Sequence, residues 1–143
     1  MKQQHLLEKA IYIALVAHKG QKDKGGFAYI LHPLRIMNLM ETTEEKIVAL
    51  LHDVVEDSDI TIQYLAENGY PDKILTAIKI LTKKENQPYF DYILAIKRNR
   101  LASKIKKADL KDNMNKSRLK IITENDMARL KKYKIAYKML LEE

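Results

Sequence analysis

Apolar residues recur every three or four positions along most of the chain, and this spacing predicts amphipathic helices. No stretch shows the strict alternation of a half-buried strand, and no sequence repeat is present. The first predicted helix covers residues 2–18. Later ones begin near Pro33 and Thr42, and the rest cover residues 62–68, 71–81, 89–98, 101–113 and 124–141.

Capping residues mark where two of these helices begin. Thr42 followed by Glu45 is a capping box, in which each side chain satisfies a backbone N–H of the other residue. Pro33 suits the first turn of a helix, where its missing N–H costs nothing, and it places His32 at or just before that helix. We therefore predict an all-α fold, with a single compact multi-helix domain over residues 1–143.

The composition agrees with this class. A chain of 143 residues, 46% of them hydrophobic and only 4 of them Gly and 3 Pro, is long enough for one domain with a real core. The absence of Cys excludes disulfides and thiolate metal sites, and it fits a reducing compartment. No apolar run approaches the length of a membrane span, and the first residues lack the apolar core of a signal peptide. We predict a cytoplasmic location.

The net charge of +7 favours a polyanionic partner, either a nucleic acid or a phosphorylated small molecule. Much of the excess lies in lysine-rich clusters, and lysines on helices usually form a solvated face. These clusters are residues 97–100, 104–107 and 131–134. The charge alone does not choose between the two partners.

The stretch around His52 places four ionisable residues directly after the apolar run 47–51. Unpaired charge beside a core is costly, and coordination of a metal makes it tolerable. If one helix carries the stretch, His52 lies one turn from Glu56 and Asp53 one turn from Asp57, so that both pairs face one place. The alternative is an amphipathic helix that ends in a solvated acidic turn.

Two further segments add candidate ligands. The first segment places His32 directly before Pro33. In the second, Asp109 lies four residues before Asn113, so that Asp109 and Asn113 point to one side of their helix. Taken singly, such a His is more often a satisfied core or surface residue, and such an Asp a surface ion pair. Together the segments supply two imidazoles and two carboxylates without sulfur, a set that suits Mn²⁺ and can also take Fe, Co, Zn or Mg.

The order of these motifs resembles the HD-domain metal-dependent phosphohydrolases, and among them the RelA/SpoT-type hydrolases of guanosine tetra- and pentaphosphate. The resemblance covers roughly residues 5–120, and it is specific as an ordered set, whereas a bare His-Asp pair is weak. Four segments carry it: His18-Lys19-Gly20-Gln21, residues 29–34, residues 49–57 and residues 107–113. It also implies a short, stand-alone bacterial member without a synthetase or regulatory domain.

The resemblance implies a role for each matched residue. The metal ligands of the family fall on four positions, which are His32, His52, Asp53 and Asp109. Its catalytic acidic pair falls on Glu56 and Asp57. Its nucleotide contacts fall on Lys24, Tyr29 and Asn113, with His18 close by in the order of motifs.

Two departures from the family pattern concern the substrate. A segment Arg-Lys-Ser-Gly-Glu-Pro-Tyr helps to hold the guanine nucleotide in the family, and an acid, Asp23, replaces its arginine here. After Asp109 the family usually has Arg, and then His just before the Asn, whereas this chain has Leu110 and Asp112. We therefore expect a complete metal site beside an altered nucleotide pocket. The pair Gly25-Gly26 could admit a phosphate to backbone amides, although a plain turn is the commoner reading.

These residues predict an enzyme, a metal-dependent phosphohydrolase of nucleotides. The leading substrate is the alarmone 3′-pyrophosphate, released as pyrophosphate. The metal would activate a water and polarise a phosphoryl oxygen, while Glu56 accepts a proton and Asp57 assists. Lys24 could balance phosphate charge; Arg35 and Lys107 could do so too, although a surface position is the commoner role for both.

Three alternatives stay open. The chain could hydrolyse another nucleotide, such as a dNTP or a nucleoside monophosphate, or it could bind a nucleotide without catalysis. A basic nucleic-acid-binding protein would explain the charge but not the candidate metal ligands, so we rank it last. The oligomeric state, monomer or homodimer, and the role of the basic C-terminal helix are not determined by the sequence.

Overall fold

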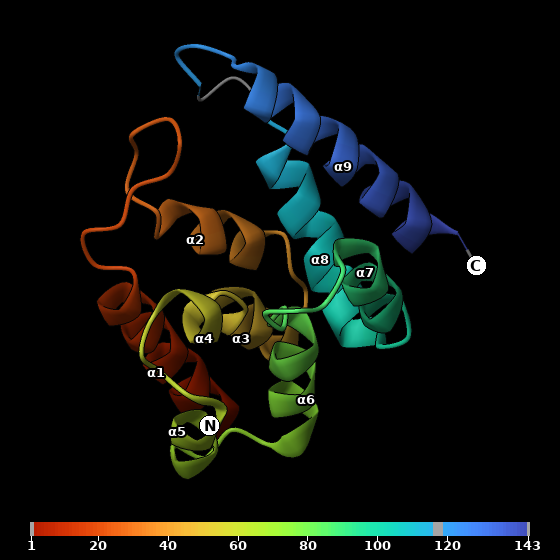
Figure 1. Ribbon diagram of the computed structural model, residues 1–143. Coiled ribbons are helices and arrows are strands. Elements are labelled where there is room, and N and C mark those ends of the chain that lie inside the picture. Colours follow the sequence, from red (N-terminus) through yellow and green to blue (C-terminus); the bar gives the residue numbers. More distant parts are fainter. Residues whose placement is uncertain (1, 116–118, 143) are drawn as a thin grey trace.

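The computed structural model describes residues 2–115 and 119–142, which form helices joined by short connections (Figure 1). In order, the helices are α1 (Lys2–Ala17), α2 (Leu31–Asn38), α3 (Thr43–Leu51), α4 (Val54–Asp57), α5 (Ile62–Glu67), α6 (Asp72–Leu81), α7 (Tyr89–Lys97), α8 (Arg100–Asn113) and α9 (Glu124–Leu141). The described ranges contain no strand beyond an isolated antiparallel bridge between Lys22 and Ala28. The predicted all-α class is confirmed.

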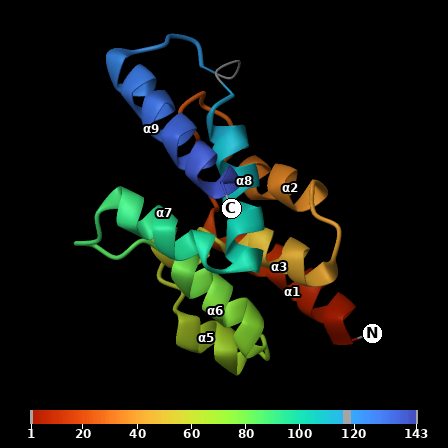
Figure 2. The ribbon, with the colours of Figure 1, turned by 90° about the vertical axis from the view of Figure 1, so that its right-hand side faces the viewer.

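Helix α3 lies at the centre of the core. Its residues 47–51 are almost completely buried, because α1, α2, α6 and α8 all pack against it. Helix α9 lies across α7 and α8 in both views (Figures 1 and 2). The apolar run before His52 therefore anchors that residue in the middle of the molecule. Among the described helices, none combines the length and the apolar composition that a membrane span requires.

The caps explain why the helices begin where they do. Thr42 Oγ1 accepts from the backbone N–H of Glu45, and Glu45 Oε1 accepts from that of Thr42, both at 3.1 Å, so the predicted capping box is present. Helix α2 begins earlier than predicted, at Leu31, and Pro33 is the third residue of its first turn. His32 therefore lies inside this helix rather than before it.

The helix that we predicted through His52 and Asp53 is interrupted at these two residues. Helix α3 ends at Leu51, and α4 begins only at Val54. The His52 imidazole donates from Nδ1 to the carbonyl oxygen of Ala49 at 2.6 Å, and in a continuous helix that carbonyl would accept the N–H of Asp53. The prediction of one continuous helix is therefore wrong at this junction. His52 and Asp53 nevertheless keep α-region backbone angles, and the acidic pair lies on the short helix beyond them.

Candidate metal centre

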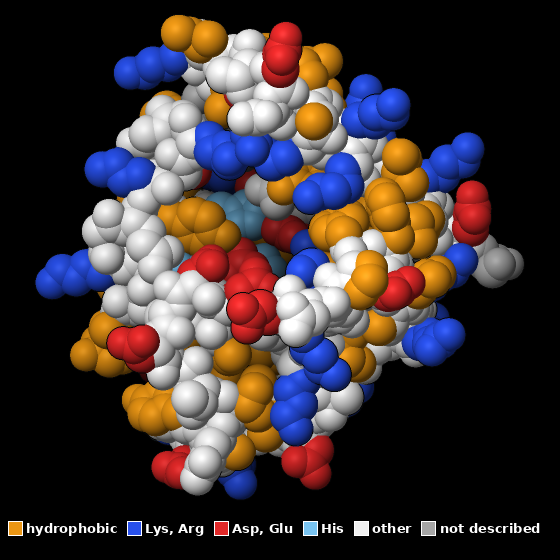
Figure 3. All heavy atoms as spheres, viewed as in Figure 1, with side chains coloured by type: hydrophobic (Ala, Val, Ile, Leu, Met, Phe, Trp, Pro, Cys, Tyr) orange, Lys and Arg blue, Asp and Glu red, His pale blue; other side chains and the backbone are white. Residues whose placement is uncertain are grey.

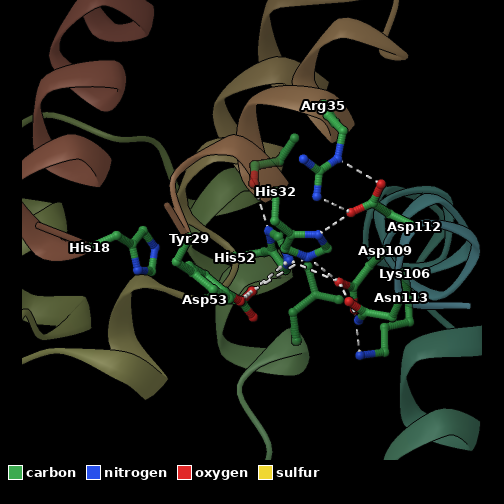
Figure 4. Close-up of polar contacts among 12 residues, drawn as sticks. His18, Tyr29, His32, Arg35, His52, Asp53, Lys106, Asp109, Asp112 and Asn113 are labelled. Carbon is green, nitrogen blue, oxygen red and sulfur yellow. Dashed lines mark hydrogen bonds and ion pairs between the residues drawn. The ribbon is translucent and has the colours of Figure 1, made fainter. Parts of the chain in front are cut away.

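Four side chains from three parts of the chain converge below the surface (Figure 4). His32 comes from α2, Asp109 from α8, and His52 and Asp53 from the junction between α3 and α4. One nitrogen or oxygen atom from each residue lies within 4.8 Å of the other three. The structure therefore brings together all four residues that the sequence predicts as ligands, and their binding of a metal stays a prediction.

The surroundings of the His52 imidazole show whether a cation fits this cluster. Because Nδ1 donates to the Ala49 carbonyl, Nε2 carries a lone pair in the neutral ring. This nitrogen is buried and makes no hydrogen bond within the described residues, yet Asp53 Oδ2 lies 3.1 Å away and Asp109 Oδ1 3.5 Å away. A lone pair that faces two carboxylate oxygens is repelled, so Nε2 must either carry a proton or bind a metal cation. Burial lowers the pKa of His52, but the two carboxylates outweigh it and raise the pKa well above its usual value, so the cluster attracts positive charge.

His32 has an acidic partner on each side of its ring. Its Nε2 lies 2.7 Å from Asp109 Oδ1 and 3.9 Å from Asp53 Oδ2. Its Nδ1 lies 2.6 Å from Asp112 Oδ2, and Arg35 holds the same carboxylate through two hydrogen bonds of 2.8 and 2.9 Å. Nε2 of the ring therefore points into the cluster, and Nδ1 points away from it.

Asp109 also binds cationic and amide groups. Lys106 Nζ lies 2.8 Å from Asp109 Oδ2, and Asn113 Nδ2 donates to Asp109 Oδ1 at 3.2 Å. Burial favours the protonated acid, but the charge of Lys106, the hydrogen bond from His32 and the charge of the His52 ring hold the pKa of Asp109 well below its usual range. Asp109 is therefore an ionised carboxylate, as a metal ligand must be.

A hollow of about 390 Å³ opens beside the cluster. Figure 3 shows imidazoles at its floor, with acidic and basic side chains around them. Ionisable residues at its lining are of both signs: Asp53, Glu56, Asp57 and Asp109, with Lys83, Lys106 and Lys132. The lysines of this lining can bind a phosphate group, and the carboxylates lie beside that group as titratable acids.

The predicted catalytic pair lies in the wall of this hollow. Glu56 Oε1 accepts the backbone N–H of Lys83 at 2.9 Å, which fixes one of its oxygens. Burial raises the pKa of Glu56, and burial together with the charges of Asp53 and Glu56 raises the pKa of Asp57 to about 6. Both acids can therefore exchange a proton closer to neutral pH than an ordinary Asp or Glu can.

A second hollow of about 330 Å³ adjoins the first, and the two share Tyr29, Asn113 and Tyr133. Of the predicted nucleotide contacts, Lys24, Tyr29 and Asn113 line it. His18 does not: it is buried with its ring 4.8 Å from that of Tyr29, and its Nδ1 bonds Gln21 Oε1. His18 thus supports Tyr29 from behind rather than lining the hollow.

The turn around the glycine pair uses its own backbone amides. Asp23 Oδ1 accepts from the N–H groups of Gly25 and Phe27, each at 2.9 Å, and the N–H of Gly26 donates to the Asp23 carbonyl at 3.0 Å. Gly26 has φ of +86°, which a residue with a side chain rarely adopts. The plain-turn interpretation holds, and the acid in place of the family's arginine organises the turn.

Several residues at the site were not found from the sequence. Lys106, rather than the predicted Lys107, contacts the cluster, and its spacing of three residues before Asp109 was a signal for this. Arg35, for which a surface position is the commoner role, is instead paired with Asp112. The lysines of α9 and of the loop before α7 come from distant parts of the chain, and no local pattern predicts their approach.

The helical fold and the four candidate ligands (one His, a His-Asp pair and one Asp) are those expected of an HD-type domain. No family model matches the chain. In fold, it is similar to a solved structure described as a metazoan ortholog of SpoT that hydrolyzes ppGpp, with a TM-score of 0.79 and 19% identity, over 96% of this chain and 85% of that one.

The curated relatives agree with that likeness. The chain is 30% identical over 120 residues, 76% of its length, to the guanosine-3′,5′-bis(diphosphate) 3′-pyrophosphohydrolase of Aquifex aeolicus. It is 34% identical over 116 residues, 71% of its length, to the protein of the same name from Haemophilus influenzae. It is 41% identical over 71 residues, 46% of its length, to the putative chloroplastic GTP diphosphokinase RSH1 of Arabidopsis thaliana. The chain spans only 8% to 17% of the length of these relatives. Its resemblance to RelA/SpoT-type proteins is thereby confirmed in sequence and in fold.

Proposed function

We propose that this chain is a metal-dependent phosphohydrolase that removes the 3′-pyrophosphate of guanosine tetra- or pentaphosphate. The observation that carries the proposal is the cluster of four candidate ligand atoms, all within 4.8 Å of one another, beside an acidic pair in one hollow. The substrate is proposed from the names of the relatives from Aquifex aeolicus and Haemophilus influenzae.

In this proposal His32, His52, Asp53 and Asp109 hold a divalent metal, for which we propose Mn²⁺ because imidazole and carboxylate ligands without sulfur suit it. When bound, such a metal supplies positive charge that polarises a phosphoryl oxygen and lowers the pKa of water. The buried, unbonded Nε2 of His52 supports this assignment, because it provides a lone pair directed at the cluster.

In this proposal the other residues of the hollow transfer protons or offset the charge of the phosphates. Glu56, with one oxygen fixed by the Lys83 N–H, accepts the proton of the attacking water, and Asp57 assists it. Lys83, Lys106 and Lys132 lie around the same hollow and offset the charge of the phosphates. The nucleoside part occupies the adjoining hollow beside Lys24, Tyr29 and Asn113. The proposal further takes the helices as one HD-type domain of a cytoplasmic monomer or homodimer.

The test is hydrolysis of guanosine tetraphosphate by metal-stripped protein with Mn²⁺ added back, followed by pyrophosphate release. Asp53→Ala should lose nearly all turnover, and Asp59→Ala, an exposed aspartate six residues on, serves as the matched control. A loss of only a few-fold in Asp53→Ala would contradict the proposal. If a dNTP or a nucleoside monophosphate is hydrolysed instead, that nucleotide is the substrate. Tight nucleotide binding without any hydrolysis would indicate a non-catalytic module.

A further inference from the structure

We infer that Asp112, clamped by Arg35, is a positioning residue that fixes the His32 ring and strengthens metal binding at the cluster. The inference rests on the proposed function in one respect, which is that the cluster holds a metal. Asp112 lies outside the predicted site, and in the sequence it stood out only as a departure from the family pattern near the nucleotide pocket.

The contact between Asp112 and His32 determines where the imidazole carries its proton. Asp112 Oδ2 lies 2.6 Å from His32 Nδ1, and the two side chains are 12% and 4% exposed. An ionised carboxylate can only accept, so Nδ1 is the donor and Nε2 is left with its lone pair in the neutral ring. Nε2 faces the cluster, where Asp109 Oδ1 lies at 2.7 Å, a distance at which a proton or a metal ion must lie between the two atoms (Figure 4). The ring is thus held with Nδ1 as the donor to Asp112 and with Nε2 directed at the cluster, the orientation that a metal ligand needs.

Arg35 holds the carboxylate itself in place. Its Nε and Nη2 donate to the two oxygens of Asp112 at 2.8 and 2.9 Å, which is the paired geometry that a guanidinium and a carboxylate favour. Arg35 lies three residues after His32, so both side chains leave the same face of α2. One aspartate of α8 is therefore bound by two residues of α2, and it cannot rotate without breaking both contacts.

The two histidines of the cluster are supported unequally. His52 donates from Nδ1 to the neutral carbonyl of Ala49, whereas His32 donates to a charged carboxylate. A carboxylate partner makes an imidazole more basic, and hence a stronger ligand, than a neutral partner does. Removing the charge of Asp112 should therefore weaken metal binding through His32 even though Asp112 does not reach the cluster.

The position of Asp112 separates this role from nucleotide recognition. The described residues that line the two hollows include its neighbour Asn113 but not Asp112. The sequence departure at Asp112 therefore bears on the metal centre rather than on the pocket. Leu110, the other departure, is fully buried in the core.

The experiment is a titration of metal-stripped protein with Mn²⁺ in competition with a chelating dye. Asp112→Asn keeps the shape of the side chain and removes its charge, and we expect it to bind Mn²⁺ about 10- to 100-fold more weakly than wild type. Arg35→Gln removes the clamp, and it should weaken binding in the same direction by a smaller factor. Glu67→Gln on α5 removes the same charge from an exposed position, and its affinity should equal that of wild type.

A second measurement distinguishes positioning from a simple tie between α2 and α8. In Zn²⁺-loaded protein, ¹⁵N spectra should show a protonated Nδ1 and a metal-shifted Nε2 for His32, and Asp112→Asn should alter the Nδ1 signal while leaving that of His52 in place. Folded Asp112→Asn and Arg35→Gln that bind Mn²⁺ as tightly as wild type would overturn the inference alone. Failure of the wild type to bind Mn²⁺ would overturn the proposed metal centre and the inference with it.

Discussion

The hydroxyl of Tyr29 donates a hydrogen bond of 2.5 Å to Asp53 Oδ2. A residue predicted to contact nucleotide thus supports a candidate metal ligand. The Tyr29 ring also lies between two imidazoles, 4.8 Å from that of His18 and 5.6 Å from that of His32. Because Tyr29 lines both hollows, it connects the cluster to the space proposed for the nucleoside.

Tyr29→Phe should weaken metal binding more than catalysis at saturating metal. The change removes only the hydroxyl, so Asp53 loses a hydrogen bond while the ring contacts remain. We expect the Mn²⁺ concentration for half-maximal activity to rise about tenfold, with kcat at saturating Mn²⁺ little changed. Tyr12→Phe, at a position 67% exposed on α1, is the matched control. A raised KM for the nucleotide with unaltered metal dependence would instead assign the hydroxyl to substrate.

Glu56→Gln should separate proton transfer from metal binding. The amide oxygen of the variant can still accept the Lys83 N–H, so the local structure is kept while the base is lost. We expect kcat to fall by about 10²- to 10⁴-fold, with Mn²⁺ affinity unchanged in a direct titration. Glu85→Gln, in the exposed loop that follows Lys83, should behave as wild type. Near-normal turnover in Glu56→Gln would remove Glu56 from the mechanism.

Asp57→Asn should stabilise the metal-free protein, but only at pH values at which Asp57 of the wild type is ionised. Burial and the charges of Asp53 and Glu56 raise the pKa of Asp57 from 3.8 to about 6. The folded state therefore binds this proton more tightly than the unfolded state, so its contribution to stability is present at low pH and is lost as the pH rises through about 6. Asparagine cannot ionise, so the variant gains stability relative to wild type as the pH rises.

Thermal unfolding in chelator at two pH values, one on each side of this pKa, measures the effect. The Tm advantage of Asp57→Asn should be larger at the higher pH. The same advantage at both pH values would show that Asp57 does not titrate in this range.

Thr42→Ala should lower stability without altering the metal centre. The capping box satisfies backbone N–H groups at the start of α3, the helix that carries the buried run ahead of His52. Loss of such a cap costs about 1 kcal/mol of unfolding free energy, measured by urea denaturation. Thr43→Ala changes the neighbouring threonine, which is not the cap, and should cost less. A weaker Mn²⁺ affinity in folded Thr42→Ala would show that the cap also positions the cluster.

The helices and the four candidate ligands could be predicted because their signals are local. The capping box at Thr42 lies within four residues, and the order of His and Asp motifs can be found without knowing which helices touch. The interruption at His52 could not be predicted, because the residues around it have helical periodicity. Only in the fold does the buried imidazole donate to the Ala49 carbonyl, where the regular helix ends.

The residues alone were enough to predict the all-α class, most helix starts and the four side chains that meet at the cluster. The tertiary structure decided which of the surrounding charges take part. It selected Lys106 rather than Lys107, turned Arg35 inward onto Asp112, and moved His18 behind Tyr29. Periodicity and caps act over a few residues. The partner of a buried charge is instead set by the packing of α2 against α8, whose contacting residues lie 77 to 80 positions apart in the chain.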